Sequence, residues 1–185
     1  LVKGIHLEGL RVLGKPESFA KFYYEQGADE LFYQDVVASL YGRNSLQDII
    51  SRTAKEIFIP LTVAGGIRSV DDMRNILRAG ADKVAINTAA IETPNLLYEG
   101  AKIFGSQCIV SSIEVYRKEG GFCEVWVDYG REATGINAIE WAKRVADLGA
   151  GEILLTSIDK DGTMQGYDVD LVKAITESVN IPVIA

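Results

Sequence analysis

Apolar and polar positions along this chain follow two different periods. Short runs rich in Val, Ile and Leu predict buried strands, and the segments between them carry apolar residues at helical spacing. We expect strands at about residues 31–37, 58–63, 83–86, 108–115, 152–157 and 181–185, and helices at 17–26, 45–55, 70–79, 94–104, 138–148 and 169–179. This alternation is typical of a parallel sheet built from βα units, so the predicted fold class is α/β.

One segment departs from the alternation. In residues 116–128, Glu119-Gly120-Gly121 stands between two stretches of β-forming residues. A Gly-containing turn between such stretches favours a short antiparallel hairpin. We therefore expect a hairpin inserted in a βα loop.

The chain repeats itself at a constant offset of 122 residues, from Phe19 to Trp141. Residues 19–21 resemble 141–143, residues 27–30 resemble 149–152, and Ile59-Pro60 recurs as Ile181-Pro182. Three separated blocks with one offset favour duplication over chance agreement. Two such repeats approach the roughly 250 residues typical of a barrel of eight βα units.

The repeat therefore predicts a single domain with the (β/α)₈ TIM-barrel fold, made of two repeated half-barrels. The first repeat would run to about residue 105 and the second from about residue 106. Ala185 corresponds to Val63, just before Gly65-Gly66, so we expect the barrel to be incomplete at both ends in this chain. An open doubly wound sheet is the runner-up fold.

Composition narrows the function classes. With 48% hydrophobic and 24% charged residues and no apolar run of membrane-spanning length, the chain is expected to be soluble and not to bind membranes. A formal charge of −7 argues against nucleic-acid binding but leaves small anionic substrates open. Cys108 and Cys123 fit neither a metal site nor a disulfide framework, so we expect a cytoplasmic protein with no metal and no cofactor.

Two loops after predicted strands are candidates for phosphate binding. The active sites of TIM barrels lie at the C-terminal strand ends, where Gly65-Gly66 and Asn87-Thr88 fall. Glycine lets backbone amides approach an anion, and amide and hydroxyl side chains could complete the cradle. A structural turn and helix capping by Thr88 or Thr93 are the alternative interpretations.

Carboxylates follow other predicted strands. Glu114 would point into the barrel mouth, where partial desolvation can tune a general acid or base. The loop with Asp159, Asp161 and Gly162 also follows a buried strand, although loop acids are commonly turn formers. Asp35 has a similar position, with a structural hydrogen-bonded carboxylate as the alternative.

At the opposite strand ends, three charges occupy related positions. The repeat makes Glu30 and Glu152 equivalent, and Lys83 begins a strand between them. They would either form a solvated rim or close the barrel bottom with salt bridges. The single histidine, His6, is expected in a loop without a catalytic role.

Several motifs resemble those of the HisF family. They are Leu-Thr-Val-Ala-Gly-Gly-Ile-Arg at 61–68, Ala-Asp-Lys-Val-Ala-Ile-Asn-Thr-Ala-Ala at 81–90, Phe-Gly-Ser-Gln at 104–107, and Gly-Ala-Gly-Glu-Ile-Leu-Leu-Thr-Ser-Ile-Asp-Lys-Asp-Gly-Thr at 149–163 with Gly-Tyr-Asp at 166–168. The similarity covers essentially the whole chain, and the last motif is highly specific.

The resemblance implies a cyclase that takes ammonia from a HisH-like glutaminase partner. Its bis-phosphorylated substrate would be the phosphoribulosyl-formimino-AICAR ribonucleotide, converted to imidazole glycerol phosphate and the AICAR ribonucleotide in histidine biosynthesis. The family's roles transfer to matching positions: Glu114 as catalytic acid; Lys3, Asp35 and Thr156 lining the substrate; Gly66, Asn87 and Thr88 at one phosphate; Asp161 and Gly162 at the other; and Glu30, Lys83 and Glu152 as the ammonia gate.

The chain also departs from the family pattern. Of the two family aspartates, one would precede Leu1 and the other aligns with Glu114, whose side chain is one methylene longer. The loop at residues 4–16 lacks acidic residues usual in the family. These changes resemble HisF-like paralogs that pass ammonia to an amidino-sugar in surface-polysaccharide synthesis. A catalytically inactive scaffold for a glutaminase is a further alternative.

Overall fold

The computed structural model describes residues 2–35 and 47–185. Its strands are β1 (Val2–Ile5), β2 (Glu8–Val12), β3 (Leu31–Gln34), β4 (Leu61–Ala64), β5 (Lys83–Ile86), β6 (Ile109–Arg117), β7 (Cys123–Val127), β8 (Glu132–Asn137), β9 (Glu152–Ser157) and β10 (Val183–Ile184). Its helices are α1 (Pro16–Glu25), α3 (Gln47–Thr53), α4 (Val70–Arg78), α5 (Thr88–Glu92), α6 (Asn95–Phe104), the 3₁₀ turn η1 (Ser106–Cys108), α7 (Ala138–Asp147) and α8 (Val169–Thr176).

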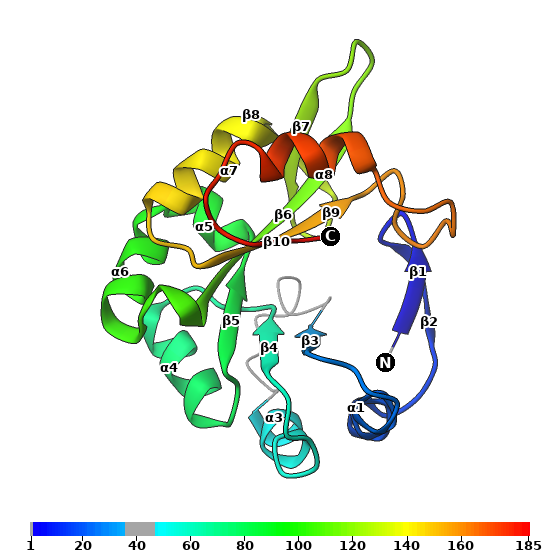
Figure 1. Cartoon of the computed structure of the whole chain (residues 1–185), viewed down its shortest axis with the longest axis vertical. Helices are drawn as coiled ribbons and strands as arrows, with labels where there is room; N and C mark the ends of the chain where they lie inside the picture. Colours follow the sequence, from blue (N-terminus) through cyan, green and yellow to red (C-terminus); the bar gives the residue numbers. More distant parts are fainter. Residues whose placement is uncertain (1, 36–46) are drawn as a thin grey trace.

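Parallel strands form a sheet in the order β10-β9-β6-β5-β4-β3. The sheet curves into an arc with α3, α4, α6 and α7 on its outer side, and the β1–β2 hairpin stands across the opening of the arc (Figure 1). Helices on one side of a curved parallel sheet are the arrangement of a TIM barrel and not of an open doubly wound sheet. The predicted fold class is therefore confirmed as a partial (β/α)-barrel.

The predicted elements are present, with shifted ends. The strands at 83–86 and 152–157 have the predicted bounds, whereas the strand expected from residue 58 begins at Leu61. Because Pro60 has no N–H to donate to a neighbouring strand, the strand starts one residue later. The Pro60 carbonyl oxygen still accepts from the Leu31 N–H at 2.9 Å. Residues 36–37 of one predicted strand and 45–46 of one predicted helix lie outside the described residues.

The expected hairpin is also present and longer than predicted. β7 pairs antiparallel with the end of β6, and β8 pairs with β7, so the insertion adds two strands that form an antiparallel ribbon with the end of β6. The β1–β2 hairpin was not predicted, and it replaces most of the loop expected at residues 4–16. His6 itself lies in the turn between the two strands, as a loop residue.

Local geometry repeats at the offset found in the sequence. Helices α1 and α7 begin and end at equivalent residues, and the register Leu31 opposite Leu61 recurs as Ile153 opposite Val183. The hydrogen bond from Leu31 to Pro60 likewise recurs from the Ile153 N–H to the Pro182 carbonyl, at 2.9 Å in both cases. The division of the domain near residues 105 and 106 stays a prediction.

The two faces of the sheet carry different side chains. Large buried residues such as Met73 and Trp141 pack between the strands and the outer helices. The cluster on the inner side consists of Ala64, Ala85 and Val110 with Phe32 and Leu154 packed against it. Two of these are alanines, whose side chains are smaller than the large ones of the cluster beneath the helices.

The described ranges contain no helix that combines the length and the apolar character needed to span a membrane.

Candidate active site

A cavity of about 440 Å³ opens at the C-terminal ends of β3, β4, β5 and β6. Predicted site residues that follow β3, β4 and β5 or belong to β6 line it, namely Asp35, Gly66, Asn87, Thr88 and Glu114. The curvature of the sheet brings these residues together although they are far apart in sequence. The structure thus brings these five residues to one cavity, while their roles in binding and catalysis stay predictions.

Glu114 is the buried acid of this cavity. Its residue is only 2% exposed, and its Oε2 accepts from the Gly130 N–H at 2.9 Å. Burial raises the pKa of Glu114 to about 7. Hydrogen bonds from Gly130, Asn87 and Gln34 favour the charged form and lower the pKa, but the effect of burial is larger. A carboxyl that is about half protonated at neutral pH can both donate and accept a proton.

The raised pKa of Glu114 predicts how the stability of the protein depends on pH. The pKa of Glu114 is 4.5 in the unfolded reference and about 7 in the fold, so its contribution is fully present below pH 4.5 and is lost as the pH rises to about 7. The loss amounts to about 3 kcal/mol, because each pKa unit corresponds to 1.36 kcal/mol. Urea unfolding at pH 5 and pH 8 should therefore show a smaller pH-dependent decrease in Glu114→Gln than in the unmodified protein. Equal decreases in both proteins would contradict the buried, neutral carboxyl.

The glycine loop after β4 packs closely against the end of β3. Gly65 has a φ of 102°, and a Cβ there would lie 2.5 Å from the carbonyl oxygen of Asp35. The Asp35 N–H also donates to the Ala64 carbonyl at 2.9 Å. Gly65 is thus required for the close approach of two strand ends, while Gly66, with a φ of 70°, lines the cavity.

Asn87 and Thr88 do not act as simple helix caps. The Asn87 side chain makes no capping bond to α5, and within the described residues its buried Oδ1 has no hydrogen-bond partner. The Thr88 hydroxyl instead accepts from the Asp128 N–H at 3.1 Å and thereby holds the turn between β7 and β8. Both side chains remain on the wall of the cavity.

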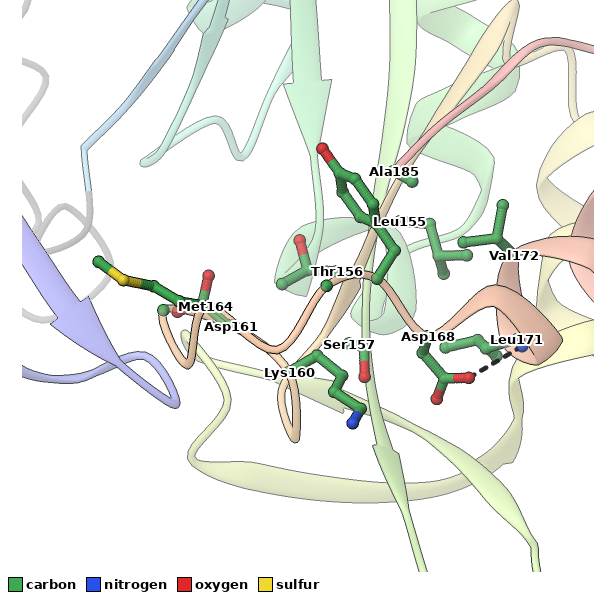
Figure 2. Close-up of a pocket in the computed structure, with 13 residues that line it drawn as sticks. Leu155, Thr156, Ser157, Lys160, Asp161, Met164, Asp168, Leu171, Val172 and Ala185 are labelled. Atoms are coloured by element: carbon green, nitrogen blue, oxygen red, sulfur yellow. Dashed lines mark hydrogen bonds between the residues drawn. The ribbon is translucent and has the colours of Figure 1, made fainter.

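The loop after β9 borders a second cavity of about 370 Å³. Figure 2 shows Thr156, Lys160 and Asp161 around it, and Gly162 also lines it. The loop is held in place by the turn of the β1–β2 hairpin. His6 donates its N–H to the Asp161 carbonyl at 3.0 Å, and the Leu7 N–H donates to Asp161 Oδ2 at 3.2 Å.

Sequence reasoning missed a second support of the same loop. Arg117, at the end of β6, donates two hydrogen bonds to Asp168 at 2.8 and 2.9 Å, and its backbone N–H donates to Asp159 at 2.9 Å. Asp168 also caps α8 by accepting from the Leu171 N–H. The inserted hairpin therefore positions both ends of the loop that carries Asp161.

The three charges at the opposite strand ends are in contact. Lys83 Nζ lies 2.7 Å from Glu152 Oε1 and 3.1 Å from Glu30 Oε2. Burial acts to lower the pKa of Lys83, but hydrogen bonds and charges of both glutamates outweigh it and leave the pKa raised. Of the two expected arrangements, the structure has the salt-bridged one.

Two remaining predictions concern Lys3 and metal binding. Lys3 belongs to β1, but its side chain lies outside the described part of the structure. Across residues 2–35 and 47–185, His, Cys, Asp and Glu form no group of three or more that could hold a metal ion.

Comparison of the sequence with known proteins identifies the family of this chain. All 185 residues match the family model described as "Histidine biosynthesis protein". The chain is 59% identical to the imidazole glycerol phosphate synthase subunit HisF of Legionella pneumophila, over all of this chain and 87% of that protein. It is 52% identical to HisF of Methanocaldococcus jannaschii and 51% identical to HisF of Alkaliphilus metalliredigens, covering 75% and 73% of those proteins.

Proposed function

The chain belongs to the histidine biosynthesis protein family and within it to HisF, and we propose from this premise that it is the cyclase subunit of imidazole glycerol phosphate synthase. Glu114 carries the proposal. It is a buried acid with a pKa of about 7, at the strand end where the family resemblance expects a catalytic carboxyl. Ring closure with ammonia requires proton transfers, and an acid that titrates near neutral pH is suited to them.

We propose that the substrate spans the two cavities. A substrate with a phosphate at each end fits two cavities that each carry candidate phosphate-binding residues, with Gly66, Asn87 and Thr88 at the first and Asp161 and Gly162 at the second. Glu114 lines the first cavity. Asp35 and Thr156 would line the substrate, because each lines one of the two cavities. Lys3, in β1, is assigned the same role on the family resemblance alone.

The proposal includes a glutaminase partner of the HisH type. Ammonia is released by glutamine hydrolysis in that partner and would enter through the opposite end of the barrel. The Glu30, Lys83 and Glu152 cluster lies at that end, and we propose it as the gate. The small inner residues Ala64 and Ala85 support a path from this cluster toward Glu114.

The test is an assay of the full-length protein with the phosphoribulosyl-formimino-AICAR ribonucleotide and an ammonium salt, without a glutaminase. We expect imidazole glycerol phosphate and the AICAR ribonucleotide in equal amounts, because one substrate is split into both. The HisF of Legionella pneumophila, assayed in parallel, controls for substrate quality. Substrate left intact by this protein and consumed by the control would reject the proposal.

A second candidate rests on the residue at position 114. A glutamate stands where the family resemblance expects an aspartate, which shifts the carboxyl by one methylene and suits a different acceptor. The second candidate is an enzyme that passes ammonia to an amidino-sugar. Formation of an amidino group on a sugar acceptor, with the ribonucleotide left intact, would favour it. An inactive scaffold would bind a glutaminase and convert neither substrate.

A further inference from the structure

The turn between β7 and β8 has an unusual backbone. Asp128, Tyr129 and Gly130 have φ angles of 51°, 59° and 70°, so three successive residues are in the left-handed region. Glycine adopts this region freely, but a side chain with a Cβ is strained there. The chain thus places a bulky Tyr129 in a conformation that favours glycine.

Residues of the candidate active site hold this turn in place. The Asp128 N–H donates to the Thr88 hydroxyl at 3.1 Å, and the Gly130 N–H donates to Glu114 Oε2 at 2.9 Å. A Cβ on Gly130 would lie 2.9 Å from Cδ1 of Leu7, at the turn of the β1–β2 hairpin. The turn is therefore fixed from both sides, and strained residues retained in this way are a feature of functional sites.

Tyr129 belongs to the wall of the first cavity proposed to bind the substrate. It lines the 440 Å³ cavity together with Glu114 and Asn87. Burial raises the pKa of its phenol, and the charges of Asp161 and Glu114 raise it further, so the phenol stays neutral and lies close enough to the Asp161 loop for that charge to act on it. The Arg131 guanidinium is 5.9 Å from the centre of the ring.

We propose that Tyr129 is a substrate-positioning residue whose ring forms the wall between the Glu114 cavity and the Asp161 loop. This inference rests on the proposed function and adds to it a residue outside the resemblance. A substrate held by a phosphate at each end must pass this ring, and a flat aromatic face is suited to the planar heterocycle between the two phosphates. The strained turn fixes the ring before the substrate arrives.

The test compares Tyr129→Gly and Tyr129→Phe with the unmodified protein in the ribonucleotide assay at saturating ammonium. We expect Tyr129→Gly to raise KM at least about tenfold and to change kcat by less than about threefold, because the ring contributes binding and not chemistry. Tyr129→Phe keeps the ring and should restore KM to within about threefold of the unmodified value. Tyr98→Ala removes an exposed aromatic ring from α6 and controls for loss of an aromatic side chain elsewhere.

The strain is measured separately. Tyr129→Gly and Tyr129→Ala both lack the ring, so their melting temperatures differ mainly through the backbone. We expect the Gly variant to melt about 2–4 °C higher than the Ala variant. Equal melting temperatures would reject the strained turn.

The kinetic outcomes separate this inference from the proposed function. An unmodified protein that does not convert the ribonucleotide rejects the proposed function, and this inference with it. An active unmodified protein with an unchanged KM in Tyr129→Gly rejects only the role of Tyr129. A fall in kcat with unchanged KM, or an equal rise of KM in the Phe and Gly variants, also rejects the positioning ring.

Discussion

Replacing Glu114 with Gln is expected to lower turnover of the ribonucleotide by roughly 10²- to 10⁴-fold, the usual contribution of general acid–base catalysis. Glutamine keeps the size of the side chain and can still accept from the Gly130 N–H, but it has no transferable proton. Substrate affinity should therefore change little, and the loss should fall on kcat. Steady-state kinetics with ammonium as the nitrogen source measure both constants.

The pH profile provides an internal check on this prediction. With a pKa of about 7 in the free enzyme, Glu114 should produce a limb of kcat/KM near neutral pH that is absent from the residual activity of Glu114→Gln. A Glu114→Gln variant that turns over ribonucleotide at the unmodified rate would make Glu114 a structural residue. If the amidino-sugar function is the correct one, Glu114→Asp should gain some cyclisation of the ribonucleotide, because it returns the carboxyl to the family position.

The parts of the fold predicted from sequence are those determined by local pattern. The strands at 83–86 and 152–157 are short apolar runs that begin with a charged residue, and both bounds were predicted. Strand starts near Pro60 and Pro182 were placed too early, because apolar periodicity continues through a residue that cannot donate to the ladder. Period alone does not distinguish an apolar residue before a strand from one inside it.

The features that sequence reasoning missed are stabilised by distant contacts. The β1–β2 hairpin turns at His6 and Leu7, which have φ angles of 52° and 60° and are not typical turn residues. Hydrogen bonds to Ile158 and Asp161 hold them from more than 150 residues away. The turn at Tyr129 is likewise held by Thr88 and Glu114, and the adjacent Asp128 and Gly130 mark a turn without identifying its backbone conformation.

The sequence was enough to select residues that line the two cavities, but not the residues that hold their loops in place. Position after a strand was enough to select Glu114, Asn87 and Asp161, because a barrel gathers those positions at one mouth. Arg117 was not selected, since its partner Asp168 is 51 residues away and belongs to a different loop. A signal existed in the specific Gly-Tyr-Asp motif at 166–168, which marks Asp168 without identifying what it binds.

Replacing Lys83 with Met is expected to lower the free energy of unfolding by about 2–3 kcal/mol at pH 7, somewhat less than the loss of one partner from a fully buried ion pair. The Lys83 and Glu152 side chains are 13% and 20% exposed, whereas Glu30 is 47% exposed and can turn to solvent. Glu152 would be left with a largely buried charge, and its Oε2 already has no hydrogen-bond partner in the described structure. Urea unfolding measures the loss.

Two further variants separate charge from packing, and a coupled assay tests the proposed gate. Lys83→Arg keeps the cation and should retain most of the stability, and adding Glu152→Gln to Lys83→Met should recover part of the loss, because the unpaired charge is removed with its partner. If the cluster gates ammonia, Lys83→Met should also change the ratio of glutamine-driven to ammonium-driven turnover by at least about tenfold, since only ammonia from the glutaminase passes Lys83. An unchanged ratio in a folded Lys83→Met variant would leave Glu30, Lys83 and Glu152 as a structural ion cluster that closes the bottom of the barrel.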